Sequence, residues 1–189
     1  RAGHLVIATS RSKQEEITNI EWHPLDLDTK ESVEAFCMSP LWDHTVDVVF
    51  NNAGFGLTAP IESASETAIR TQFEANYFAT MKITQRAMAH FREQGQGILM
   101  INTSIGGRMA FPYFGYYNAT KHALEASYEA LWYECLGSNI KIKIIEPGFT
   151  QTRFATHGMQ MSGETSPHHA QALSRLAQSM RAGTTATPP

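Results

Sequence analysis

The sequence predicts an α/β fold, in which a mainly parallel sheet carries helices on both of its faces within a single domain. Short apolar runs alternate along the chain with longer segments of helical periodicity. Such alternation requires crossover connections between parallel strands. The length of 189 residues and the 42% hydrophobic content suit one globular domain with a core.

The expected strands are short segments rich in apolar and β-branched residues. In chain order they are residues 4–9, 20–25, 46–50, 97–103 and 140–146. Segment 46–50 (VDVVF) is almost entirely apolar, which is typical of a strand buried on both faces of a parallel sheet.

The expected helices lie between these strands, where apolar residues recur at spacings of three and four. They are residues 29–38, 65–94, 115–136 and 166–181. Pro40, Gly95 and Gly137 follow the first three segments as stop signals, and Pro167 stands near the first turn of the last.

The bulk properties exclude several classes of protein. A net charge of −3 gives no reason to expect nucleic acid or an anionic membrane as partner. No apolar run reaches the roughly 20 residues of a membrane helix, and no signal peptide is evident, so a cytoplasmic protein is expected. Cys37 and Cys135 lack the spacing of a zinc or redox motif. The adjacent His168 and His169 have no third metal ligand at a suitable spacing, so no metal is expected.

Polar groups follow the expected strands at the edge where doubly wound sheets bind ligands. Asn51-Asn52-Ala53-Gly54 follows segment 46–50, Ser104 follows 97–103, and Pro147-Gly148 follows 140–146. Tyr117 and Lys121 stand four residues apart and therefore share one face of the helix 115–136.

This set is suited to hydride transfer between a nicotinamide and a carbonyl or alcohol. A lysine ammonium beside a tyrosine favours the phenolate and lowers the pKa of the phenol, so Tyr117 can exchange a proton with a substrate oxygen. The Ser104 hydroxyl can hydrogen-bond the same oxygen. Lys121 has further donors for a ribose hydroxyl, and the cofactor performs the redox step.

At these residues the chain resembles the short-chain dehydrogenase/reductase family, over residues 4–154. Besides Tyr117-x-x-x-Lys121 and the Asn-Asn-Ala-Gly run, Ser104, Asn76 and Asn52 stand at the family's usual intervals. The resemblance implies a Rossmann-type doubly wound parallel sheet in three α/β/α layers. Segment 54–59 also fits the G-x-G-x-x-A dinucleotide pattern, but Pro60 interrupts the helix start and two strands precede it, so it is not expected to be the phosphate loop.

The resemblance implies a role for each site residue. Tyr117 would be the acid/base, Lys121 would lower its pKa and hold the nicotinamide ribose, and Ser104 would position the substrate carbonyl. Asn76 would hold a kink in the helix 65–94 and a water that relays protons to Lys121. The remaining residues expected to bind the cofactor are Asp26, Leu27, Asn52, Ala53, Gly54, Pro147, Gly148, Thr150 and Thr152.

The resemblance also implies a Gly-rich phosphate loop and a final strand that the sequence does not contain. The chain is therefore expected to lack the first βα unit and the last strand, and to leave two exposed edges where a central strand would lie. A genuinely shorter variant is the alternative.

Cofactor and substrate preferences are read from two further segments. Ser10 and Arg11 follow the strand 4–9, where no acid is present, and Arg11 can pair with a 2′-phosphate; NADP(H) is therefore expected, with NAD(H) as the alternative. Apolar side chains around the site favour an apolar or aromatic ketone or secondary alcohol. The residues expected to meet the substrate are Ser104, Met109, Phe114, Tyr117 and Phe149.

The sequence leaves three functions open. The first is a carbonyl reductase or alcohol dehydrogenase; the others are an inactive or cofactor-sensing binding protein and a nucleotide-sugar epimerase or dehydratase. A homodimer or homotetramer is expected through the two long helices, which carry apolar residues on more than one face. These residues include Met88, Phe91, Leu131, Trp132 and Leu136.

Overall fold

The computed structural model describes residues 3–12, 14–148, 154, 158–163 and 166–183. Every ladder between its named strands is parallel, as the sequence predicts. Three sheets result. They are β1 (Val6–Ser10) with β2 (Ile20–Pro24), then β3 (Val48–Asn51), β5 (Gly97–Asn102) and β6 (Ile140–Ile145) in the order β3-β5-β6, and finally β4 (Gly56–Thr58) with β7 (Met159–Met161).

Helices connect these strands at the predicted places. They are α1 (Lys30–Cys37), α2 (Glu66–Phe73), the π-helical segment η2 (Glu74–Ala79), α3 (Thr80–Gln94), α4 (Gly115–Glu134) and α6 (Pro167–Gly183), with short 3-10 turns η1 (Pro40–Asp43) and η3 (Ile105–Gly107). Ser65 caps α2 by accepting a hydrogen bond from the Ala68 amide at 3.2 Å. Gly95 ends α3 with a φ of 82°, a left-handed conformation that glycine adopts without a steric penalty.

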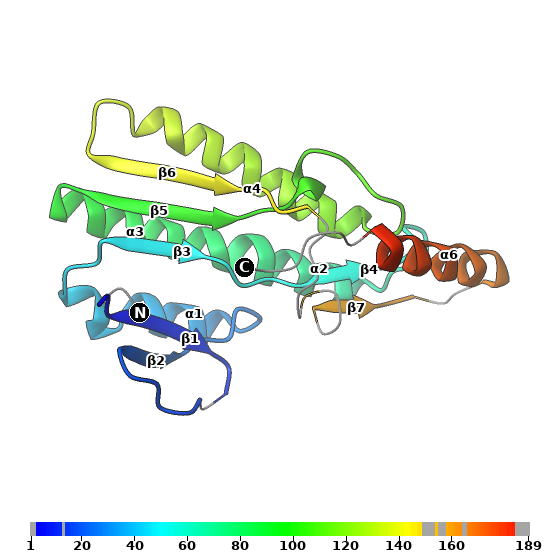
Figure 1. Cartoon of the computed structure of the whole chain (residues 1–189), viewed down its shortest axis with the longest axis horizontal. Coiled ribbons are helices and arrows are strands. Elements are labelled where there is room, and N and C mark those ends of the chain that lie inside the picture. Colours follow the sequence, from blue (N-terminus) through cyan, green and yellow to red (C-terminus); the bar gives the residue numbers. More distant parts are fainter. Residues whose placement is uncertain (1–2, 13, 149–153, 155–157, 164–165, 184–189) are drawn as a thin grey trace.

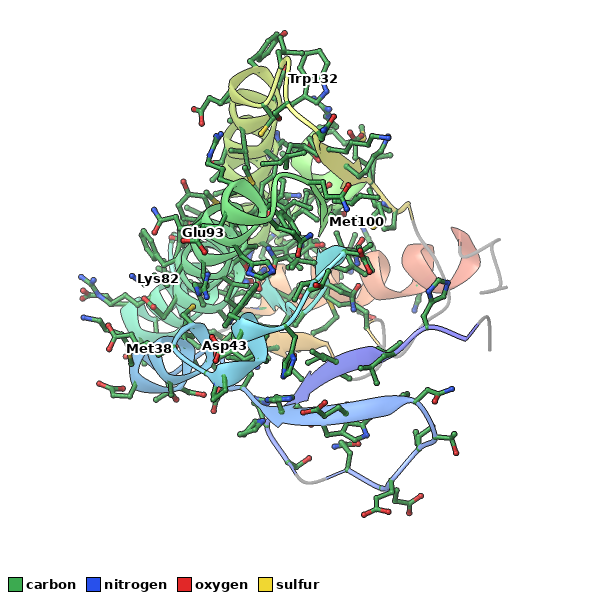
Figure 2. All side chains as sticks on the ribbon, turned by 90° about the vertical axis from the view of Figure 1, so that its left-hand side faces the viewer. Met38, Asp43, Lys82, Glu93, Met100 and Trp132 are labelled. Atoms are coloured by element: carbon green, nitrogen blue, oxygen red, sulfur yellow. The ribbon has the colours of Figure 1, made fainter. Side chains whose placement is uncertain are left out.

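The helices α1, α3 and α4 lie on the same side of the β3-β5-β6 sheet (Figures 1 and 2). The core between α3, α4 and the sheet contains Phe91, Leu99, Leu124 and Tyr128, all of them at most 1% exposed. In Figure 2, Lys82 and Glu93 lie on the side of α3 that faces away from this core. The β3-β5-β6 sheet is therefore held to α3 and α4 by one apolar cluster, while α1 packs on α3 through a smaller one.

The prediction that the segment 46–50 is buried on both faces is wrong for the described residues. Val48 and Phe50 of β3 are each 47% exposed, while the intervening Val49 packs against the main core. Side chains alternate along a strand, so Val49 faces the helices, and Val48 and Phe50 point to the opposite face of the sheet.

Two of the apolar residues expected at a helix–helix interface lie in the core instead. Met88 and Phe91 of α3 are 7% and 0% exposed, because the stripe they belong to faces the sheet. Leu131 is half-buried against the same core. Trp132 and Leu136, at the end of α4, are 47% and 63% exposed, and Figure 2 shows Trp132 at the periphery of the molecule.

No ladder joins β1 and β3 among the described residues. One edge of each strand is therefore unpaired there, and these are the two edges that the resemblance predicts to be exposed. Segment 54–59 contributes the strand β4, not the start of a helix, which agrees with its rejection as a phosphate loop. Cys37 and Cys135 are buried free thiols. Of the helices described, none combines the length and the apolar character needed to cross a bilayer.

Candidate active site

Ser104 and Tyr117 meet beyond the carboxyl end of β5. Ser104 is the N-cap of η3, and its hydroxyl accepts a hydrogen bond from the Gly106 amide at 3.0 Å. Tyr117 extends from the first turn of α4, and its Cε1 and Ser104 Oγ lie 3.3 and 3.4 Å from the position that a Cβ on Gly106 would occupy. The two side chains predicted to act on one substrate oxygen therefore lie side by side.

Tyr117 is enclosed by aromatic rings. It is 8% exposed, and the centroids of Phe114 and Phe154 lie 6.3 and 5.9 Å from the centroid of its ring. Burial raises the pKa of Tyr117 above its ordinary value, and the hydrogen bond from Ser104 opposes this only in part. At neutral pH the phenol is therefore protonated in this structure.

Lys121 is buried one turn further along α4. The residue is 6% exposed, and its Nζ donates a hydrogen bond of 2.7 Å to the Asn102 carbonyl. Burial lowers the pKa of this ammonium from 10.5 to about 8, while the charge of Glu125 acts in the opposite direction.

The expectation that Lys121 lowers the pKa of Tyr117 is not met in this structure, where that pKa is raised. Nζ lies 5.8 Å from the centroid of the Tyr117 ring and is directed to the backbone of β5. Desolvation of the phenol is the larger effect.

Asn102 connects this helix to the Asn-Asn-Ala-Gly turn. Its Nδ2 donates to Asn52 Oδ1 at 3.0 Å, while its carbonyl accepts from Lys121. Asn52, Ala53 and Gly54 lie exposed after β3, the position expected for residues that line a cofactor. Asn102 thus links the exposed turn and the buried Lys121 through hydrogen bonds.

Asn76 lies within the π-helical segment η2, at the place where a kink in the long helix is expected. Its amide accepts from the Phe55 amide at 3.0 Å and donates to the Phe55 carbonyl at 2.8 Å, with Thr120 Oγ1 at 3.4 Å from Nδ2. A Cβ on Gly54 would lie 3.1 Å from Asn76 Oδ1, so this glycine allows the close approach. The described contacts of Asn76 are thus with the loop and with α4.

Four of the residues expected to bind the cofactor lie at or just after the ends of β1 and β2. Arg11 is exposed, with Nη1 3.9 Å from Asp28 Oδ2. Ser10 Oγ accepts from Gln14 Nε2 at 2.9 Å, and Asp26 Oδ1 accepts from the Asp28 amide at 3.1 Å. Leu27 packs against the small core cluster around α1. Arg11 has thus a weak acidic partner and a guanidinium that remains accessible.

The remaining predicted residues divide into two groups. The Pro147 carbonyl accepts from the Ile105 amide at 2.9 Å, which places Pro147 and Gly148 beside Ser104. Phe114 is buried and Met109 is half-exposed. Phe149, Thr150 and Thr152 lie outside the described residues.

Several polar residues that hold this site together were not predicted. Gln72, fully buried, accepts from the Leu57 amide at 2.6 Å and donates to the Phe55 carbonyl at 3.0 Å. Asn118 Nδ2 donates to the Gly106 carbonyl at 2.8 Å, and its Oδ1 accepts from the Phe111 amide at 3.0 Å. Both amides stand on apolar helix faces, and that position is the signal that could have marked them.

The donor set at this edge of the sheet fits a nicotinamide nucleotide. The exposed turn Asn52–Gly54 lies near Lys121, which uses one of its three donors in the bond to Asn102. Arg11, after β1, is accessible to a phosphate. Among the described residues no group of side chains is arranged to hold a metal ion.

Comparison with known proteins gives one consistent family. The family model described as short chain dehydrogenase matches residues 4–162. The 3-ketodihydrosphingosine reductase of Bacteroides thetaiotaomicron is 32% identical over 153 residues, which are 80% of this chain and 57% of that protein. A short-chain dehydrogenase from Streptomyces avermitilis is 29% identical with a TM-score of 0.81, covering 96% of this chain and 74% of that one. The structure of ElxO with NADP bound is 25% identical with a TM-score of 0.72, covering 80% and 66%.

The chain spans about half the length of the curated relatives it matches. The matched region nevertheless includes Asn76, Ser104, Tyr117 and Lys121, all within residues 4–162.

The depressed pKa of Lys121 predicts how stability depends on pH. Because this pKa is lower in the folded than in the unfolded chain, the unfolded chain binds more protons between about pH 8 and 10.5, and stability rises with pH across that window. Relative to Lys121→Met, the free energy of unfolding of the parent should rise by about 2 kcal/mol between pH 7 and 9.5. Urea denaturation at both pH values measures this difference, and parallel pH dependences in the two proteins would contradict it.

Proposed function

The chain belongs to the short-chain dehydrogenase/reductase family, and on that premise we propose that it is an NADP(H)-dependent oxidoreductase acting on an apolar carbonyl compound or secondary alcohol. The observation that carries the proposal is that Ser104 Oγ and the Tyr117 ring both lie against Gly106, with the Lys121 ammonium one turn along α4. An inactive cofactor-binding protein would have no need for a serine and a protonated phenol side by side.

The proton is the chain's own contribution to the reaction. When bound, the nicotinamide supplies or accepts the hydride at the substrate carbon. In the reductive direction Tyr117 donates its phenolic proton to the substrate oxygen, and Ser104 hydrogen-bonds the same oxygen.

Lys121 acts on the phenolate that remains. A positive charge near the Tyr117 ring stabilises that anion and assists its re-protonation. With a pKa of about 8, Lys121 is mostly charged at neutral pH and can itself pass on a proton. Two of its donors remain for a ribose hydroxyl while the third holds the Asn102 carbonyl.

The preference for NADP(H) rests on Arg11. Its guanidinium is exposed, and its acidic neighbour Asp28 is 3.9 Å away, too far for a short bidentate pair. A 2′-phosphate carries more charge than one carboxylate and would displace Asp28 as the partner of Arg11.

The apolar substrate is supported by the rings around the phenol. Phe114 and Phe154 flank Tyr117, and Met159 lies close to Phe154 beside Gly56. The name of one relative, 3-ketodihydrosphingosine reductase, agrees with a ketone substrate.

Tyr117→Phe removes the proton donor and should lower kcat by at least about 10²-fold, since general acid catalysis typically contributes that much. NADPH binding, followed by its fluorescence, should persist. The measurement is NADPH oxidation by the intact protein with a panel of apolar ketones. Tyr116→Phe is the matched control, because the Tyr116 hydroxyl donates to the Ile61 carbonyl outside the site. Parent-like turnover in Tyr117→Phe would refute the mechanism.

Arg11→Ala should weaken NADPH binding by about 1.5–3 kcal/mol, the contribution of a charge-assisted hydrogen bond. NADH binding should change little, because NADH lacks the phosphate. Arg70→Ala serves as control, since Arg70 is equally exposed and pairs with Glu66 at 2.7 Å. Fluorescence titration with both cofactors decides the matter; an equal loss for NADPH and NADH would mean that Arg11 does not bind the phosphate.

We also propose a homodimer or homotetramer through exposed apolar residues of the two long helical segments. These are Phe78 in η2, which is 55% exposed, and Trp132 and Leu136 at the end of α4, which are 47% and 63% exposed. Trp132→Glu should shift the intact protein toward monomer in sedimentation velocity at micromolar concentration. A parent protein that already sediments as a monomer would rule the assembly out.

A further inference from the structure

Glu125 is a buried carboxylate that the reaction described above does not use. It lies on α4 one turn after Lys121 and is 4% exposed. Neither of its carboxylate oxygens makes a hydrogen bond to a described residue. Its counter-charge is the guanidinium of Arg108, whose Nη2 lies 3.3 Å from Glu125 Oε2.

Arg108 divides its charge between two acids. It follows η3 directly, and its Nη2 and Nε donate to Glu146 Oε1 at 2.8 and 3.1 Å. Glu146 is the residue before Pro147. One guanidinium therefore joins the loop after Ser104, the middle of α4 and the end of β6.

Arg108 donates its hydrogen bonds to the exposed Glu146 and meets the buried Glu125 only as an ion pair, so Glu125 is only partly neutralised. Burying a carboxylate without full pairing is costly, so the negative charge of Glu125 is retained at the expense of stability. The residue that benefits is Lys121 on the preceding turn of α4, where burial lowers its pKa and the charge of Glu125 raises it.

The other groups around Lys121 carry no comparable charge. On the side of β5 it meets the Asn102 carbonyl, on its own helix Tyr117 precedes it, and η2 contributes the uncharged Asn76 near Thr120. His122, the next residue, is exposed, and its ring meets the Asn118 carbonyl. On η3 and at the end of β6, Arg108 and Glu146 stand beyond Glu125.

We propose that Glu125 is a positioning residue that holds Lys121 as a charged ammonium beside Tyr117, and that Arg108 adjusts this effect by sharing its guanidinium between Glu125 and Glu146. The inference rests on the proposed function only in assigning the charged Lys121 a use, which is proton transfer through Tyr117. The electrostatic coupling itself requires neither cofactor nor turnover.

The test is a direct titration of Lys121 in the intact, cofactor-free protein with lysine labelled at ¹³Cε, followed by NMR; Lys121→Arg assigns the resonance. Glu125→Gln removes the negative charge, so the titration midpoint of Lys121 should fall by about 1 in pH. Arg108→Gln leaves Glu125 without its counter-charge, so the midpoint should rise. Glu129→Gln, the same change on an exposed residue one turn beyond, is the control and should leave the midpoint unchanged.

Opposite shifts in the two variants support the inference, because a purely structural role would not reverse its sign. If Glu125→Gln does not fold, Arg108→Gln decides alone, since Arg108 is 52% exposed in its side chain. A Lys121 midpoint that stays at the parent value in Arg108→Gln overturns the proposal even if the protein is an active reductase. Opposite shifts in a protein without reductase activity would refute the proposed function and leave this coupling intact.

Discussion

The contact on which the site depends is the hydrogen bond from the buried Lys121 ammonium to the Asn102 carbonyl. A buried charge is stable in that position only while a strong hydrogen-bond acceptor stays within reach. The position of α4 along its axis is therefore fixed relative to the end of β5. The side chain of Asn102 extends the same constraint to Asn52 and hence to the turn after β3. Two strand ends and one helix are thereby held in register around the phenol of Tyr117.

Beyond the β3-β5-β6 sheet, amide side chains hydrogen-bond the backbone that borders the site. Gln72 and Asn76 bind the backbone of residues 55 and 57, and Asn118 binds that of 106 and 111. Each amide offers both a donor and an acceptor, so it can substitute for the ladder partner that a loop lacks. The backbone that borders the site is therefore anchored to helices, in β4 as well as in η3 and the loop after it.

Much of the fold follows from periodicity alone. The parallel strands and the long helices were predictable because apolar spacing reports local conformation directly. The short strands β4 and β7 were not, because three residues carry no period and their pairing joins residues about one hundred positions apart. Met88 and Phe91 were assigned to the wrong side of α3, since a stripe does not state which neighbour it faces. At the site, spacing indicated Ser104, Tyr117 and Lys121, whereas the raised pKa of Tyr117 and the burial of Glu125 depend on packing that no local pattern records.

The π-helical segment Glu74–Ala79 divides what would otherwise be one helix into two with different angular phase. A wider turn accommodates one additional residue, and one residue corresponds to a rotation of roughly 100° about the helix axis. Gln72 and Asn76 can thus face the loop beside the site, while Ala87 and Phe91 pack against the sheet and Thr84 accepts a hydrogen bond from Asn51 of β3. Loss of a single residue from this turn would rotate one half against the other, so its length is under a constraint that its composition does not reveal.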